Sequence, residues 1–443
     1  MKFAQEFRKA LQREEFPQKW VDCAIPYGQL KKCLKKVTNE LQELGLGKDT
    51  LAGLAESRRS DSDLRFRYYL DGKTGPSAHF RPRLTVFVQL KDGIAVDARL
   101  TPATREFLEK IAFEQTPDST GNLPLVTAAP SLGDPGSSNE LGDVRQVEVP
   151  LVFDAQFFEI LQTDVSNIGT LQEEEQLKLQ TQITQLGQDL GRTIDPSQGR
   201  KAKADLEVWR NIFELYLDAR VFFSARERDS GARTSAQAVE QLHWFQDQVV
   251  QRRLVRKLKS SSSQAAFSSF VQLNVALLSI LKFREINNLA VQKILKKFDK
   301  RTSLGVSKTF PAAVNSDRLL ASSVARDVCA QMSRQLIATV PQLDDYLCPI
   351  CLSVAYWPVK LQCQHTFCSR CLVKMSRKGE RFCPLCRADT IMLAGLENFD
   401  ADRAAFLRKY FPKEVKEKVR ANERERNEEI FGPGHKNVEC CVM

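Results

Sequence analysis

The sequence predicts a mainly α-helical fold: a helical bundle with a β-containing insertion, followed by a small cysteine-rich α+β module and a helical tail. Between residues 154 and 300, apolar side chains recur over long stretches with the period of an α-helix. Seven of the 12 cysteines lie between residues 348 and 386. Residues 401–427 return to a helical pattern that is rich in Lys and Arg.

Length and composition narrow the class of protein. A chain of 443 residues with 42% apolar side chains is long enough for more than one packed unit. Its net charge of +10 and isoelectric point near 9.0 favour an anionic partner. A nucleic acid, an acidic membrane surface and a polyphosphorylated small molecule all fit this description, and charge alone does not choose among them.

The cellular compartment is predicted from the absence of two targeting features, a signal peptide and a membrane-spanning run. Residues 1–8 mix charges and do not resemble a signal peptide. No run reaches the roughly 18 apolar residues that span a bilayer. We therefore expect the chain to fold in the cytosol or the nucleus, where disulfides are rare and clustered cysteines indicate metal ligation.

The N-terminal part alternates between helical and extended patterns. Residues 1–46 predict two amphipathic helices, interrupted near Pro17 and Pro26 and ended by a Gly-Leu-Gly sequence. Residues 48–148 form an insertion with three predicted parts: an irregular polar segment, two strands joined by a Lys-Asp-Gly turn, and a loop rich in Pro, Gly and Ser. These parts cover, in order, residues 48–79, residues 83–90 with 93–96, and residues 116–143.

The rest of the chain is predicted to be helical outside the cysteine-rich module. The predicted helices cover residues 154–190, 205–228, 234–258, 264–300, 317–340 and 401–427. A run of serines at 260–263 separates two of them. A proline at position 412 is expected to break the last helix.

The cysteine-rich module has the spacing of a zinc-binding domain. Its eight candidate ligands are Cys348, Cys351, Cys363, His365, Cys368, Cys371, Cys383 and Cys386. A two-residue gap between cysteines lets one tight turn supply two thiolates to a tetrahedral zinc ion. Eight ligands make two closed sites with no open position for water, so two structural zinc ions are expected. At about 10–16 kcal/mol each, they would dominate the stability of so small a module.

This spacing resembles the C3HC4 RING family at every ligand position. The resemblance implies a cross-brace, in which Cys348, Cys351, Cys368 and Cys371 hold one zinc ion and Cys363, His365, Cys383 and Cys386 hold the other. It also implies an E3 ubiquitin ligase that binds a ubiquitin-conjugating enzyme (E2) and never carries ubiquitin itself. The other open interpretation is a zinc fold that serves only protein contact.

The resemblance assigns roles to exposed positions as well. Ile350, Pro384 and Leu385 would contact the E2, and Arg387 would be the linchpin cation that orients ubiquitin and E2 together. Many members of the family carry Trp where this chain has Met375, and the adaptable Met side chain is expected to substitute for it.

A second basic feature lies at the end of the bundle. Lys293, Lys296, Lys297 and Lys300 fall within an arc of about 100° on a helix, with Ile294, Leu295 and Phe298 on the other side. Four ammonium groups on one stripe repel one another, and a bound polyanion would relieve that repulsion. By itself, such a stripe is more often a solvated helix face than a site.

The N-terminus changes this interpretation. Met1-Lys2-Phe3, Trp20 and Tyr27-Gly28-Gln29-Leu30-Lys31-Lys32 resemble the opening helices of SPX domains, and the lysine-rich run at 289–300 resembles their last long helix. SPX domains bind inositol polyphosphates and pyrophosphates. The resemblance implies that Tyr27, Lys31 and Lys293 form the phosphate-binding cluster. It also implies an adjacent surface of Lys296, Lys297 and Lys300, joined by Lys2.

Together these features resemble the SPX–RING ubiquitin ligases of fungi and plants. The predicted organisation is an SPX domain over residues 1–305, a helical linker over 306–343, a RING finger over 344–392 and a basic tail over 393–443. The family acts in phosphate homeostasis, with membrane phosphate transporters as substrates. A non-enzymatic phosphate-responsive adaptor is the alternative. A nucleic-acid-binding zinc protein is disfavoured, because the zinc loops are not basic throughout and no groove-reading helix follows them.

The chain ends Cys440-Cys441-Val442-Met443, which fits a prenylation box and predicts a farnesyl group on Cys440. The basic tail would add attraction to an anionic membrane surface. Phe406, Tyr410 and Phe411 would lie at that interface, or else pack against the RING finger. The sequence therefore predicts a cytoplasmic protein held at a membrane.

Overall fold

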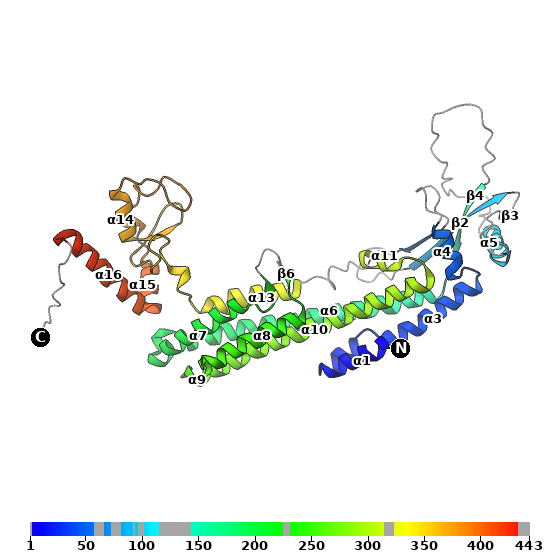
Figure 1. The fold of residues 1–443 in the computed structure, drawn as a ribbon, viewed down its shortest axis with the longest axis horizontal. Helices are drawn as coiled ribbons and strands as arrows, with labels where there is room; N and C mark the ends of the chain where they lie inside the picture. Colours follow the sequence, from blue (N-terminus) through cyan, green and yellow to red (C-terminus); the bar gives the residue numbers. More distant parts are fainter. Residues whose placement is uncertain are drawn as a thin grey trace, which may run out of the picture. The chain divides into compact units, whose positions relative to one another are not determined.

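The computed structural model describes residues 2–56, 66–71, 81–91, 94–95, 102–114, 143–224, 231–313 and 323–432. The chain forms two compact units (Figure 1). Unit 1 contains residues 1–177 and 277–324, and unit 2 contains residues 178–276 and 325–443. The long helices α6 (Phe153–Thr193) and α10 (Ser261–Thr302) contribute residues to both units.

Unit 1 begins with helices α1 (Lys2–Arg13), α2 (Gln18–Cys23) and α3 (Tyr27–Glu43). The sequence predicted two helices here, but both prolines act as full breaks, so a short third helix stands between them. Leu30, Leu34 and Val37 bury one face of α3 completely, which leaves the lysines of this helix on its outer side.

The insertion is more ordered than its sequence suggests. Helix α4 (Lys48–Glu56) and strand β1 (Phe66–Asp71) occupy part of the segment that was predicted to be irregular, so that prediction is wrong. The two predicted strands are present as β2 (Arg81–Lys91) and β3 (Ile94–Ala95). Strand β2 pairs antiparallel with β1, with β3 and with β4 (Asp143–Val149), and α5 (Pro102–Glu114) contacts β3 and β4. The loop predicted at 116–143 lies outside the described residues up to the start of β4.

Helices α6, α10 and α11 (Val306–Ala313) close the core of unit 1 around a group of phenylalanines. Phe157, Phe158 and Phe298 are fully buried, with ring centroids 5.0–5.3 Å apart. By length and composition α10 contains a window apolar enough to cross a membrane, with a mean hydropathy of 1.5, although none was expected from the sequence. In its apolar stretch, Phe270, Leu273, Leu277 and Ile280 are buried inside the protein, and core helices of this kind pass the same test.

Unit 2 is built from α7 (Arg200–Ala219), α8 (Ser235–Gln251), α9 (Leu254–Lys257) and the adjoining parts of α6 and α10, with α13 (Ser323–Gln335) leading out of it. Trp209, Phe213, Phe245 and Phe270 fill its core. Helix α7 ends earlier than predicted, because Arg220 is left-handed and a short pairing of β5 (Phe223–Ser224) with β6 (Gly231–Ala232) follows. Helix α13 lies within the predicted range 317–340, whose first residues are outside the described part.

The C-terminal part of unit 2 contains a β-hairpin of β7 (Pro358–Lys360) and β8 (Thr366–Cys368), helix α14 (Ser369–Arg377) and the tail helices α15 (Ala401–Tyr410) and α16 (Pro412–Phe431). Figure 1 shows the tail helices, in red, below the loops around α14. The break between α15 and α16 falls at Phe411, as the following proline predicted.

Candidate functional site

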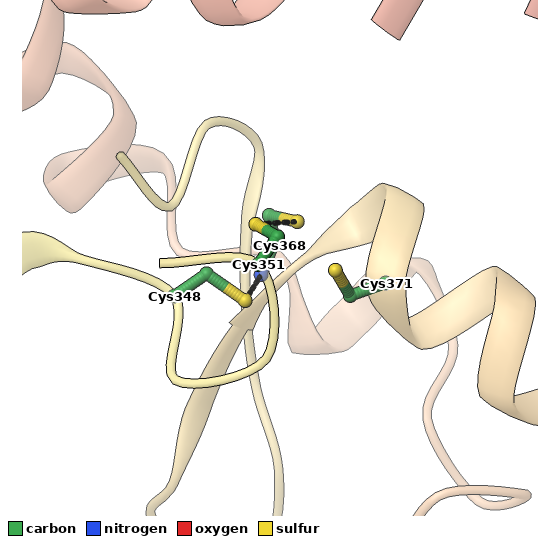
Figure 2. A group of neighbouring side chains, drawn as sticks. All are labelled: Cys348, Cys351, Cys368 and Cys371. Atoms are coloured by element: carbon green, nitrogen blue, oxygen red, sulfur yellow. Dashed lines mark hydrogen bonds between the residues drawn. The ribbon is translucent and has the colours of Figure 1, made fainter. Parts of the chain in front are cut away.

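The eight candidate metal ligands form two groups of four. Cys348, Cys351, Cys368 and Cys371 make up one group, and Cys363, His365, Cys383 and Cys386 make up the other. Within each group the ligand atoms lie within 4.8 Å of one another. Figure 2 shows the sulfurs of the first group turned toward a common centre, with Cys371 on the first turn of α14. The groups alternate along the chain, so the predicted cross-brace pairing is confirmed.

Two of the three two-residue gaps between cysteines, those after Cys348 and Cys383, are closed backbone turns of the same kind, whereas the gap after Cys368 forms the first turn of α14. The Leu352 amide donates to the Cys348 carbonyl at 2.9 Å, and the Arg387 amide donates to the Cys383 carbonyl at 2.8 Å. Both closing residues are left-handed, with φ of +52° for Leu352 and +60° for Arg387. We call these two turns the zinc knuckles, residues 348–352 and 383–387. Each knuckle brings its two thiols within 4.8 Å of each other.

A small core fixes the remaining ligands. Phe367 is fully buried between the two ligands His365 and Cys368, and Leu372, Met375 and Ile391 pack with it. Cys368 directly precedes α14, and its backbone amide donates to the Sγ of Cys348 at 3.4 Å. Hydrogen bonds from the thiol and the amide of Cys368 lower the pKa of Cys348, which favours the thiolate, the form that binds zinc.

The donor sets fit zinc. Four thiolates in one group and three thiolates with one imidazole in the other are the ligand sets of tetrahedral structural zinc sites. All four positions in each set come from the chain, so neither site leaves room for a reactive water. The chemistry of these sites is architectural: zinc would join the two knuckles, the hairpin and α14 into one rigid module.

The predicted E2-contact residues lie on the surface of this module. Ile350 is 44% exposed and Leu385 is 54% exposed, one on each zinc knuckle, and Pro384 and Arg387 are exposed beside Leu385. Met375, by contrast, is only 6% exposed and belongs to the core around Phe367. Its side chain fills the interior of the module, and its substitution for the family's Trp stays a prediction.

Unit 1 brings two parts of the predicted basic cluster together. Burial lowers the pKa of Lys297 most, and the positive charges of Lys31 and Arg301 lower it further. Lys31 on α3 and Lys297 on α10 are therefore close enough to repel each other. Arg301 was not among the predicted residues, although it ends the same basic run and the sequence carried that signal.

One buried hydrogen bond joins the start of α3 to α10: the Asn287 side chain on α10 accepts from the Ile25 amide at 2.9 Å, just before α3 begins.

The one acidic residue within the lysine run is Asp299. Its carboxylate accepts from the amides of Val306 and Ser307 at 2.6 and 2.8 Å. This carboxylate caps α11, so its charge is committed to backbone groups.

The other predicted members of the cluster differ in exposure. Lys293, Lys296 and Lys300 are exposed, whereas Tyr27 is only 6% exposed and its ring lies 4.9 Å from that of Phe3. Burial raises the pKa of Tyr27, so its hydroxyl stays protonated. Lys2 lies in α1, and its side chain is outside the described part. Contact of these residues with a phosphate stays a prediction.

Comparisons with known proteins agree with both halves of this description. The family model of the SPX domain matches residues 1–314, and that of the C3HC4-type (RING finger) zinc finger matches residues 348–386. The "Transcriptional regulator of yeast form adherence 3" of Candida albicans is 33% identical over 100% of both chains. An uncharacterized RING finger protein of Schizosaccharomyces pombe is 34% identical over 96% of each chain.

More distant relatives match only the RING region. The human E3 ubiquitin-protein ligase RNF138 is 43% identical over 47 residues, which are 10% of this chain and 19% of that protein. No solved structure matches the chain. The RING match and the ligases that share it support ubiquitin-ligase activity. Because the SPX model covers most of the chain and the two long relatives span nearly all of it, the chain belongs to the family of proteins that join an N-terminal SPX domain to a C-terminal C3HC4 RING finger.

Proposed function

We propose that this protein is a RING-type E3 ubiquitin ligase that is regulated by an inositol polyphosphate or pyrophosphate bound to its SPX domain. The observation that carries the ligase assignment is the exposure of Ile350 and Leu385 on two zinc knuckles whose ligand sets are complete. Large apolar side chains on a rigid, exposed surface are suited to bind a partner protein.

The reaction needs no nucleophile from this chain. A substrate lysine amine attacks the thioester carbonyl between ubiquitin and the E2, an isopeptide bond forms, and the E2 cysteine leaves as a thiolate. The chain would bind the E2 through Ile350, Pro384 and Leu385. Arg387 would donate hydrogen bonds to ubiquitin and the E2 together, which restricts the mobile thioester to a reactive orientation.

Autoubiquitination of the full chain with a panel of E2 enzymes tests this assignment. Ile350→Ala should abolish chain formation with every active E2. Leu396→Ala is the matched control, because Leu396 is a 93% exposed leucine that follows the RING finger and lies outside the proposed contact. An inactive wild-type protein that retains its zinc would favour the alternative, a phosphate-responsive adaptor without enzymatic activity.

The regulatory site rests on charge. Lys31 and Lys297 repel each other across two helices, Arg301 adds to that repulsion, and Asp299 is used by α11. A ligand with several phosphates would offset this repulsion, and flexible lysines can follow its crowded oxygens. We expect inositol pyrophosphates to bind more tightly than inorganic phosphate for this reason.

Calorimetry on the full chain tests the regulatory site. Lys293→Ala combined with Lys297→Ala should weaken inositol pyrophosphate binding strongly and reduce its salt dependence. Lys48→Ala combined with Lys110→Ala is the matched control, because both lysines are exposed in the same unit but lie on α4 and α5. Wild-type affinity in the first variant would remove these lysines from the site.

Membrane phosphate transporters as substrates, and a farnesyl group on Cys440, complete the proposal. Cys440 lies outside the described residues. Two of the tail aromatics do not face a membrane surface, because Phe411 is fully buried and Phe406 stacks on Tyr346. Attachment would therefore depend on the lipid and on exposed tail cations such as Lys416 and Arg420. Cell fractionation of wild type and Cys440→Ser tests it, and equal solubility of the two would refute it.

A further inference from the structure

The tail helix α16 is held along one face of α14 by ion pairs. Arg370, Lys374 and Arg377 of α14 repeat at helical spacing and therefore share a face. Glu425 accepts from Arg370 at 3.2 Å and pairs with Lys374, and Glu429 pairs with Arg370 and, at 3.3 Å, with Arg377. The Arg370 side chain is only 14% exposed, so these pairs are partly removed from solvent.

The start of α16 is fixed by apolar packing. Phe411 and Val415 are buried in one cluster with Val354, which belongs to the loop just after the first zinc knuckle. Tyr346, two residues before the first ligand, packs against the rings of Phe406 and Phe411 at centroid distances of 5.1 and 5.4 Å. Helix α16 is therefore anchored at its first turn by this cluster and further along by the ion pairs.

Lys418 lies between these two anchors and reaches a metal ligand. Its Nζ is 3.2 Å from the Sγ of Cys351, a distance at which an ammonium donates to a thiolate. The Ser353 hydroxyl approaches the same sulfur at 3.1 Å. Cys351 is the ligand of its group that remains partly exposed, whereas Cys348, Cys368 and Cys371 are buried. The lysine thus covers the sulfur that solvent would otherwise reach most easily.

The charge of this site explains what such a contact does. A zinc ion with four thiolates carries a net charge of about −2, against about −1 for the site with three thiolates and a neutral imidazole. A hydrogen bond from a cation lowers the electron density on the sulfur, so protons, oxidants and alkylating agents react with it less readily. Outer partners of this kind hold ligands in place and strengthen metal binding.

We propose that Lys418 stabilises the four-cysteine zinc site by donating a hydrogen bond to the ligand Cys351, and that zinc retention therefore depends on helix α16. Lys418 lies 67 residues after Cys351 in the chain. Its side chain reaches the Cys351 sulfur only when α16 is packed against the zinc module. Retention of zinc and protection of Cys351 are thereby linked to the docking of the tail. This role is independent of the proposed ligase activity, since it concerns metal retention alone.

The test measures zinc release from the full-length, zinc-loaded protein to a chromogenic chelator, together with alkylation of individual cysteines by N-ethylmaleimide followed by mass spectrometry. Lys418→Met keeps the apolar stem and removes the charge. Zinc release from one of the two sites should become about 10-fold faster, as for other outer-shell losses, and alkylation of Cys351 should accelerate with it. Alkylation of Cys386, in the other site, should keep its wild-type rate.

Two further variants separate charge from folding. Lys418→Arg keeps a cationic donor and should restore slow release. Lys416→Ala, an exposed lysine on the same helix, should behave as wild type. Wild-type release and alkylation rates in Lys418→Met would overturn the proposal. Equal acceleration at Cys351 and Cys386 would also overturn it, because that result indicates general loosening of the module.

Discussion

The guanidinium carbon of Arg210 lies 4.1 Å from the centroid of the Phe411 ring. From α7, the same side chain donates to the carbonyls of Pro341 and Tyr410 at 2.9 and 2.8 Å. Burial lowers the pKa of Arg210, and its hydrogen bonds go to backbone oxygens. A single half-buried cation therefore joins a helix of the bundle, the segment before the RING finger and the junction between the tail helices.

We expect Arg210→Ala to loosen this junction and to destabilise unit 2 by about 3 kcal/mol, since charged hydrogen bonds contribute about 1.5–3 kcal/mol and a desolvated cation–π contact about 2. Urea unfolding measures the loss. The stability of Arg210→Lys should lie between those of wild type and Arg210→Ala, because an ammonium keeps the charge but cannot reproduce the forked geometry of the guanidinium. Arg408→Ala, an exposed arginine on α15, is the control, and an equal loss in that variant would count against a specific junction.

Metal analysis of the full chain should find two zinc ions per molecule. Cys351→Ser and Cys363→Ser each remove a ligand from a different group and should each lower the content toward one. Chelation should unfold the RING module, because each structural zinc contributes about 10–16 kcal/mol. Amide exchange should show that the core of unit 1 around Phe157 keeps its protection. A wild-type content near one would contradict the two-site arrangement.

Replacement of the linchpin should affect catalysis and leave the fold intact. Arg387→Ala removes an exposed side chain whose backbone closes the second zinc knuckle. We expect ubiquitin discharge to slow about 10- to 100-fold, as the loss of one charged hydrogen bond would cause. Zinc content should not change. Arg381→Ala, which breaks a surface pair with Asp389, serves as control, and unchanged discharge in Arg387→Ala would exclude it from the mechanism.

Unit 1 should lose stability as the pH rises from about 4 to about 7. Burial raises the pKa of Asp154 from an ordinary 3.8 to about 7, against the opposing hydrogen bond from Tyr68. Between these values the folded chain holds a proton that the unfolded chain has released. The stabilisation is therefore complete below about pH 4 and is lost by about pH 7, by about 4 kcal/mol at most.

Thermal unfolding between pH 4 and 8 checks this dependence. Asp154→Asn should flatten the pH profile, because the amide does not titrate. Asp49→Asn, at an exposed position of α4, should retain the wild-type slope. If the slope of stability against pH in Asp154→Asn equals that of wild type, other groups control the transition. Asp164 would then be the next residue to replace, since burial raises its pKa to about 6.

The zinc ligands were predictable from sequence because spacing alone determines which thiols a tight turn can pair. The pairing of Cys351 with Cys368 followed from the family resemblance and is confirmed by the structure. The stripe of Lys293, Lys296, Lys297 and Lys300 was also predictable, because helical periodicity places their neighbours Ile294 and Phe298 in the core.

Long-range contacts were not predictable in this way. Nothing in local sequence brings Lys418 to Cys351 or Arg210 to Phe411, since these contacts depend on how distant helices pack. The burial of Met375 in the core around Phe367 was not predictable either, because the family resemblance only aligned this residue with a Trp of other members. Strand β1 was missed because its partner β2 stabilises a segment whose own pattern is weak.

In the proposed reaction, the surface carrying Ile350, Leu385 and Arg387 activates an E2 that carries ubiquitin as a thioester. Single-turnover discharge of ubiquitin from that thioester to free lysine, with and without the full zinc-loaded chain, measures this activation. We expect the wild-type chain and Leu396→Ala to accelerate discharge by at least one E2 of the panel, and Ile350→Ala to abolish that acceleration. Discharge rates that the zinc-loaded wild-type chain leaves unchanged across the panel would contradict the claim.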